Sequence, residues 1–168
     1  MIESNIMWKA FDKTELTHSS IHHLMAIHKL IESAGYARGV DISKYLNITR
    51  SSVSITIGAL KEKGYVLEDQ NKFYHLTEKG HALVDMVLEN RLILQRFFEA
   101  TLKLSPLESE AEACKTEHLL SPFGMDRMKL FNEFYVSKNE AATNFRAAWN
   151  AYIQEIEKIH NTKREEKR

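Results

Sequence analysis

The stretch "EACKTEH", residues 112–118, contains the only cysteine of the chain. Cys114, Glu117 and His118 stand at positions i, i+3 and i+4, so a helix would place all three on one face. Thiolate, carboxylate and imidazole groups are all metal ligands. A single cysteine on a helix is equally typical of a small buried apolar residue. The stretch therefore predicts either a metal site or a buried thiol beside two surface residues, and the rest of the chain has to decide between them.

The composition is that of an ordinary globular protein. The 168 residues are 43% hydrophobic and 27% charged, and 23 basic residues balance 23 acidic ones. A single cysteine excludes an internal disulfide framework and suits a reducing compartment. The N-terminal segment has no apolar core of signal-peptide type, and charged residues interrupt the most apolar segment, 83–98. These features predict a cytoplasmic protein without a membrane span.

Residues 17–77 carry the elements of a winged helix-turn-helix in the right order. An apolar helix follows Thr17 and stops near Gly35, a short helix covers Val40–Leu46, and a third helix begins near Arg50 and ends at Gly64. Two short β-like runs, 65–67 and 73–76, then surround a polar turn. Three helices followed by a β-hairpin are typical of a winged helix-turn-helix. Residues 1–16 form an N-terminal extension.

The third helix of this unit is the predicted DNA reader. It starts with short polar side chains that can enter a major groove, and basic side chains beside it can meet phosphates. Winged helices also dock proteins, and serines also cap helices. The order of elements, together with five basic against two acidic residues between positions 38 and 63, favours DNA. The predicted DNA-binding residues are Arg38, Thr49, Arg50, Ser51, Ser52, Ser54, Lys61 and Lys72.

The remaining chain is predicted to be helical. A long helix, 78–104, has apolar residues on more than one stripe and needs partners on two sides, typically its own domain and a second subunit. Residues 78–136 are therefore a predicted dimerisation domain, and because they contain Cys114, Glu117 and His118 they are also the candidate metal-binding domain. In the extension 137–168, a helix over 138–160 with a frayed end should carry apolar residues spaced by three and four: Ala142, Phe145, Trp149, Tyr152, Ile156 and Ile159. The predicted fold class is mainly α, with a winged helix-turn-helix, a helical domain and an extra C-terminal amphipathic helix.

Several motifs together resemble one family. They are "GYARGVDISKYLNITRSSVSITIGALKEKGYV", "LTEKG", "EACKTEHLLS" and "MDRM". Over residues 17–134 the chain resembles the metal-dependent transcriptional repressors of the diphtheria toxin repressor and manganese transport regulator family. The resemblance implies a homodimer that binds a divalent metal between its first helix and the helix of Cys114. The metal-loaded dimer would bind a palindromic DNA operator and repress metal uptake genes.

Carried over to this sequence, the resemblance implies one metal site in each subunit. Its ligands would be His22 and Met25 of the first helix with Cys114, Glu117 and His118. His22 and Met25 are i, i+3 neighbours, so both can face one point. This mixed soft and borderline set suits Fe²⁺, Zn²⁺ or another late first-row ion. Together with the resemblance, the expected metal is Fe²⁺ or Mn²⁺, with Zn²⁺ as a further candidate. His18, His23 and His28 are expected to be solvated or packing residues.

A second metal site of the family is predicted to be lost. Its positions fall on Arg91, Gln95 and Glu110. Arginine stays protonated and cannot ligate a metal. Our hypothesis is that the guanidinium of Arg91 pairs with Glu110, as a fixed cation in place of an exchangeable one.

Two other functions have to be weighed against metal-dependent regulation. The first is a winged-helix regulator that senses a small molecule or an oxidant through Cys114. The second is a Cys/His hydrolase, but Cys114 and His118 share one helix, whereas nucleophile and base normally come from separate elements. We therefore expect no enzyme.

Overall fold

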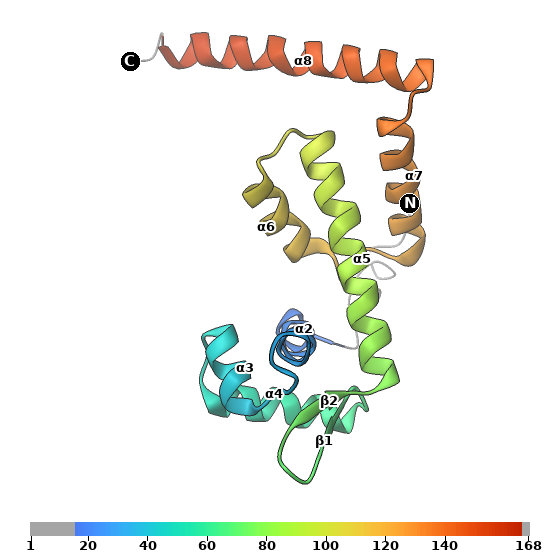
Figure 1. Ribbon diagram of the computed structural model, residues 1–168. Helices are drawn as coiled ribbons and strands as arrows, with labels where there is room; N and C mark the ends of the chain where they lie inside the picture. The colour runs from blue at the N-terminus through green and yellow to red at the C-terminus, as the bar shows by residue number, and fades with distance from the viewer. Residues whose placement is uncertain (1–15, 166–168) are drawn as a thin grey trace, which may run out of the picture. The chain divides into compact units, whose positions relative to one another are not determined.

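The computed structural model describes residues 16–165, with side chains for residues 16–159 (Figure 1). Most of the predicted N-terminal extension lies outside the described residues. In chain order the elements are α2 (His18–Ala34), α3 (Gly39–Leu46), α4 (Arg50–Glu62), β1 (Val66–Glu68), β2 (Tyr74–Leu76), α5 (Glu78–Ala100), α6 (Pro106–Thr116), α7 (Pro122–Val136) and α8 (Glu140–Glu165). The prediction of a mainly helical fold with a small hairpin is confirmed. None of the described helices is long and apolar enough to cross a membrane.

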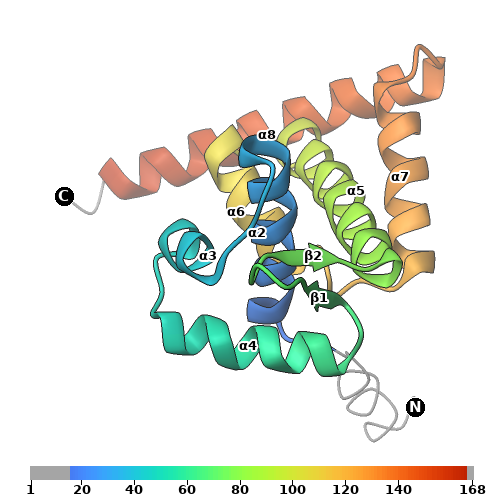
Figure 2. The same cartoon turned by 60° about the horizontal axis from the view of Figure 1, so that its bottom comes forward.

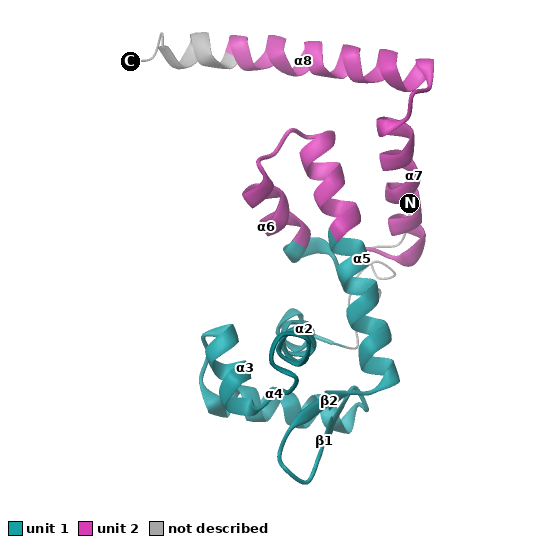
Figure 3. Cartoon of the chain, viewed as in Figure 1, with its two compact units in different colours: residues 1–91, 114–119 teal, residues 92–113, 120–168 magenta. Residues whose placement is uncertain are grey.

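The chain divides into two compact units (Figure 3). The first comprises residues up to Arg91 together with Cys114–Leu119, and the second comprises Leu92–Ala113 together with the residues from Leu120 onward. This boundary differs from the predicted one at residue 78. The reason is that the first half of α5 contributes Val84 and Val87 to the core of the first unit.

The first unit is a winged helix-turn-helix. Helices α2, α3 and α4 pack on one another, and the hairpin of β1 and β2 packs on α2 and α4 (Figure 2). The strands are antiparallel, with Val66 opposite Leu76. Thr17 caps α2 by accepting a hydrogen bond from the backbone N–H of Ser20, and Gly35 ends the helix with a φ of 79° that favours glycine. The core consists of fully buried apolar side chains, among them Leu24, Ile27, Ile42, Ile57 and Leu60.

Gly80 lets α5 begin against the hairpin. A Cβ at this position would lie 2.3 Å from the backbone oxygen of Tyr65 and 3.3 Å from the Cβ of Leu76. The hydroxyl of Thr77 accepts from the N–H of Gly80 at 3.1 Å and donates to the carbonyl of Gly64 at 2.8 Å. The winged helix and α5 are therefore joined by direct backbone packing.

The second unit has a smaller core around the second half of α5. Ile93 and Leu94 are buried there with Ala113 and Met125. Helix α7 packs against α8, the guanidinium of Arg146 donates to the carbonyl of Ser137 at 3.0 Å, and Trp149 Nε1 donates to the carbonyl of Thr101 at 2.6 Å. Two helix ends differ from prediction: α5 stops at Ala100 instead of 104, and α8 reaches Glu165 instead of 160.

Candidate metal centre and nucleic-acid interface

Metal-ligating side chains from α2 and α6 meet within the first unit. His18 and His22 lie one turn apart on α2, and Cys114 lies in the last turn of α6. The Sγ of Cys114 is 3.4 Å from Nε2 of His22. One donor atom from each of His18, His22 and Cys114 lies within 4.8 Å of the other two. The ring centroid of His18 is 4.3 Å from that of His22 and 4.9 Å from that of His118, so a third imidazole adjoins the group.

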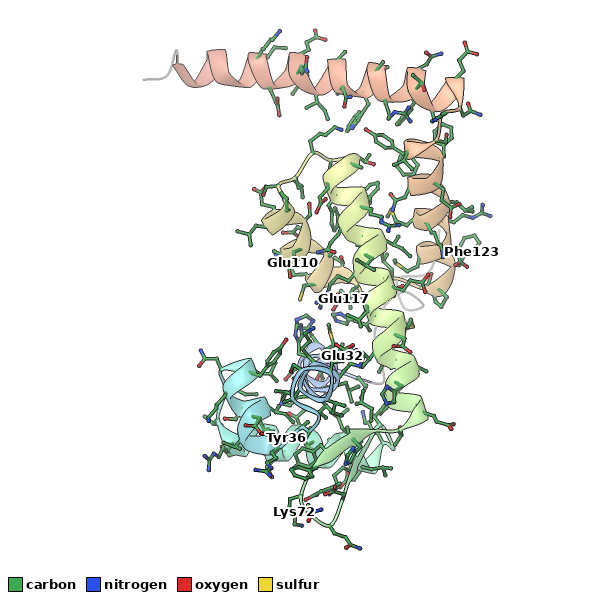
Figure 4. The ribbon with its side chains drawn as sticks, in the orientation of Figure 1. Glu32, Tyr36, Lys72, Glu110, Glu117 and Phe123 are labelled. Atoms are coloured by element: carbon green, nitrogen blue, oxygen red, sulfur yellow. The ribbon has the colours of Figure 1, made fainter. Side chains whose placement is uncertain are left out.

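Glu117 is engaged elsewhere. Its side chain is fully buried, and both carboxylate oxygens accept from Arg91, with Nε at 2.5 Å from Oε2 and Nη2 at 2.8 Å from Oε1. The backbone carbonyl of Glu117 accepts from Nδ2 of Asn90 at 2.8 Å. Figure 4 shows Glu117 beside α5. This bidentate ion pair anchors the segment after α6 to the first half of α5.

Arg91 also reaches Met25. Its Nη2 lies 3.5 Å from the Sδ of Met25, so one guanidinium contacts two of the five predicted ligands. Arg91 forms an ion pair with Glu117, whereas the hypothesis paired it with Glu110, which is exposed on α6. The physical reason is that α6 ends at Thr116. Glu117 and His118 therefore lie in the following turn, and Glu117 is not held on one helical face with Cys114.

The environment lowers the pKa of two of the imidazoles and so favours their neutral form. Burial is the main cause that lowers the pKa of His22, the neighbouring His18 lowers it further, and Glu117 opposes both. Burial, followed by His18, also lowers the pKa of His118. The Nδ1 atom of His118 is buried without a hydrogen-bond partner among the described residues. A neutral imidazole with an open nitrogen is the form that binds a metal, so the donor set fits a divalent transition metal ion.

The other histidines of α2 have different surroundings. His23 is buried, and its Nδ1 lies 2.7 Å from the carbonyl of Ser19. His28 lies 3.3 Å from the carboxylate of Glu32. The sequence-based prediction places His18 with these two residues as solvated or packing. The signal that could have separated it is its i, i+4 spacing from His22, which places the two side chains on one face of α2.

The start of α4 presents the predicted DNA-binding residues to solvent. Thr49, Arg50, Ser51, Ser52 and Ser54 are all exposed. Thr49 is also the N-cap of the helix, because its Oγ1 accepts from the backbone N–H of Ser52 at 3.2 Å. The same oxygen lies 2.9 Å from the hydroxyl of Ser51 and 2.8 Å from that of Ser52. The three hydroxyls form one network, next to which Arg50 and Ser54 are open to a partner.

The basic residues near the hairpin have neighbours that sequence reasoning missed. Lys61 and Lys72 both pair with Glu68, Lys72 at 3.3 Å. The hydrogen bond from Lys61 is the main cause that lowers the pKa of Glu68. Figure 4 shows Lys72 on the loop that joins β1 and β2. The Arg38 guanidinium carbon lies 4.6 Å from the ring centroid of Phe73 and 5.0 Å from that of Tyr36.

The structure thus combines a winged helix-turn-helix with a cluster of side chains that could hold a metal ion. Comparison with known families agrees. Residues 15–72 match the iron dependent repressor N-terminal DNA binding domain, and residues 77–141 match the iron dependent repressor metal binding and dimerisation domain. The chain belongs to the iron-dependent repressor family, whose members are metal-dependent transcriptional regulators and not enzymes.

Individual relatives are moderately similar. An uncharacterised HTH-type transcriptional regulator of Methanocaldococcus jannaschii is 33% identical over 98 residues, covering 58% of this chain and 78% of the relative. The HTH-type transcriptional regulator MntR of Listeria monocytogenes is 28% identical over 131 residues, covering 78% of this chain and 92% of the relative.

Solved structures share the fold. The manganese regulator SloR matches with a TM-score of 0.61 at 24% identity, over 67% of this chain and 52% of that one. The IdeR of T. acidophilum matches with a TM-score of 0.56 at 24% identity, over 64% of this chain and 51% of that one. This chain therefore spans about half the length of these two structures.

Proposed function

We propose that this protein is a metal-responsive repressor of metal uptake genes. In this proposal a homodimer carries one divalent metal ion per chain and binds a palindromic DNA operator. Helix α4 enters the major groove, and the hairpin with Lys72 meets the DNA backbone. The proposal combines the family's two domains with the side chains described above.

The single observation that carries the proposal is the contact between Cys114 and His22. The two side chains are 92 positions apart in sequence, yet Sγ and Nε2 are 3.4 Å apart. His22 belongs to α2, which packs on the DNA-reading helix α4. Cys114 belongs to the segment that Arg91 and Asn90 attach to α5. A metal ion held by both would stabilise one arrangement of these elements, and a preference of a few kcal/mol is enough for a switch.

The test is DNA binding as a function of metal. We expect the purified chain to bind operator DNA from the promoter of a metal uptake gene after addition of Zn²⁺, Fe²⁺ or Mn²⁺, and to release it after chelation by EDTA. His22→Ala and Cys114→Ala should each weaken the metal response, whereas His28→Ala should not. Operator binding that ignores both metal and chelator would contradict the proposal.

The same contact favours one alternative. A thiol within hydrogen-bonding distance of an imidazole can be deprotonated more easily and become sensitive to oxidants. In that case peroxide would abolish operator binding, and EDTA would leave it intact. The two functions therefore give opposite results in one assay.

A further inference from the structure

Arg91 separates the five ligands that the family resemblance implies into those it contacts and those it does not. Arg91 contacts Glu117 and Met25, whereas His22 and Cys114 contact each other. This division raises the question of which side chains remain for a metal ion.

Glu117 is a poor ligand as long as Arg91 holds it. Both carboxylate oxygens accept hydrogen bonds from the guanidinium, and the carboxylate is fully buried. A metal ion would have to break this bidentate pair and leave a permanent positive charge beside itself. The sulfur of Met25 lies 3.5 Å from the same guanidinium, so a cation at Met25 would also meet this charge.

His18 supplies a donor on the other side. It stands one helical turn before His22, and its donor atom is within 4.8 Å of the donors of His22 and Cys114. Next to it lies the ring of His118, whose buried Nδ1 has no hydrogen-bond partner in the described part of the chain. The thiol of Cys114 and the imidazoles of His18 and His22 thus lie within 4.8 Å of one another, and a third imidazole adjoins that of His18.

We propose that the metal ion is bound by His18, His22 and Cys114, with His118 as the fourth ligand, and that Arg91 withholds Glu117 and Met25 from it. Arg91 is then a tethered cation that sets metal specificity. A thiolate with imidazoles is a tetrahedral donor set for Zn²⁺, whereas Mn²⁺ prefers carboxylate and other oxygen ligands in octahedral sites. The site is therefore a zinc site and binds Mn²⁺ only weakly. This inference rests on the proposed function in one respect, namely that the chain binds a metal.

Direct metal binding tests the ligand set. Co²⁺ replaces Zn²⁺ as a spectroscopic probe, and we expect the intense visible bands of a tetrahedral ion together with a thiolate-to-cobalt charge-transfer band. Zn²⁺ is then titrated against the Co²⁺ signal. His18→Ala should lower Zn²⁺ affinity about tenfold or more, and the matched variant His28→Ala should leave it unchanged. Wild-type affinity in His18→Ala, or an octahedral Co²⁺ spectrum, would overturn the proposal.

The role of Arg91 is tested by removing its charge. In Arg91→Met the carboxylate of Glu117 is released, so we expect Mn²⁺ affinity to rise about tenfold or more relative to wild type. Arg96→Met, an exposed position on the same helix, is the control and should bind Mn²⁺ as wild type does. Unchanged Mn²⁺ affinity in folded Arg91→Met would overturn the assignment.

Failure of this inference can be distinguished from failure of the proposed function. If operator binding responds to metal but His18→Ala binds Zn²⁺ normally, only the ligand set of three imidazoles and one thiol is wrong. If neither Co²⁺ nor Zn²⁺ binds and the operator is bound without metal, the proposed function fails.

Discussion

At the scale of single residues, the ion pair of Arg91 and Glu117 is the feature with the largest consequences. It places a guanidinium that is 20% exposed against a carboxylate that is fully buried. A buried ion pair contributes little net stability compared with apolar packing, but loss of one partner leaves an uncompensated buried charge. The pair therefore makes the turn after α6 dependent on α5.

Arg91→Ala should destabilise the fold. Because Glu117 would keep a buried charge without its guanidinium, we expect the free energy of unfolding to fall by about 3 kcal/mol. Urea denaturation of the metal-free protein measures this value. The control Arg96→Ala, at an exposed position, should change it by less than about 0.5 kcal/mol. Equal stability of the two variants would show that the pair does not anchor this turn.

Glu68 gives a prediction about pH. The hydrogen bond from Lys61 lowers the pKa of Glu68 in the folded protein. A lowered pKa means that the stabilisation is present above the pKa of the unfolded chain and is lost as pH falls through the folded pKa. The ion pairs of Glu68 should therefore persist at neutral pH and be lost only in acid. A carboxyl NMR titration should show a higher midpoint for Glu68 in Lys61→Ala than in wild type or in the control Lys44→Ala.

At the scale of elements, close packing and local ion pairs determine the position of the hairpin and the charge of its basic residues. The start of α5 touches the hairpin through Gly80, and Lys61 of α4 and Lys72 of the hairpin loop share the carboxylate of Glu68. Two basic residues expected to contact phosphate are thus partly neutralised by the protein itself. The ion pairs with Glu68 help to hold the hairpin in place, but they also reduce the positive charge that Lys61 and Lys72 can offer to phosphates.

Gly80→Ala should be destabilising although alanine is the better helix former. The added Cβ would lie 2.3 Å from a backbone oxygen, so α5 or the hairpin must shift. We expect a loss of about 1–3 kcal/mol in the free energy of unfolding. Gly58→Ala is the matched control, because a Cβ there meets nothing within 4 Å, and it should gain about 0.5–1 kcal/mol. Thermal or urea denaturation measures the free energy of unfolding of both variants. If it changed in the same direction in Gly80→Ala and Gly58→Ala, the proposed close packing at Gly80 would be contradicted.

Glu68→Gln should strengthen DNA binding. With the negative charge removed, Lys61 and Lys72 become available to phosphates, so affinity should rise severalfold at low salt. The slope of log affinity against log salt should become steeper by about 1–2. Glu62→Gln at the end of α4 makes the same change in net charge and should have a smaller effect. Fluorescence anisotropy at several salt concentrations measures both, and an identical slope in wild type and Glu68→Gln would contradict the prediction.

At the scale of the whole molecule, the proposed metal site joins parts of the chain that are far apart in sequence. His18 and His22 come from the first described helix, whereas Cys114 and His118 come from the end of α6 and the turn after it. Between them lie the DNA-reading helix, the hairpin and the first half of α5. Metal binding at the proposed site would therefore be coupled to the packing of the first unit.

Zinc should stabilise the folded chain by mass action. At a free Zn²⁺ concentration 100 times its dissociation constant, the free energy of unfolding should rise by about 2.7 kcal/mol if the unfolded chain does not bind the ion. The gain should disappear in Cys114→Ala and after addition of EDTA. Calorimetry of the zinc-loaded and metal-free protein measures this gain. An equal gain in Cys114→Ala would show that zinc binds at another place.

The sequence by itself determined the secondary structure and the class of protein. The signals that predict the helices and strands are local, because each depends only on residues a few positions apart. They are helical periodicity, the cap at Thr17, the stop at Gly35 and the change of period after Gly64. The order of three helices and a hairpin, with "EACKTEH" downstream, was enough to predict a metal-dependent winged-helix regulator. The types and spacing of Cys114, Glu117 and His118 predicted a candidate metal site, and the family resemblance added His22 and Met25 to it.

Only the tertiary structure decided which of these side chains contact one another. Arg91 binds Glu117 across 26 positions and touches Met25 across 66, and His18 faces Cys114 from another helix. These contacts depend on where α6 ends and on which side chain is nearest after packing. The local periodicity of the sequence predicts neither. The physical reason is that a helix period places a residue on a face, whereas the neighbour it meets is set by the packing of the other elements.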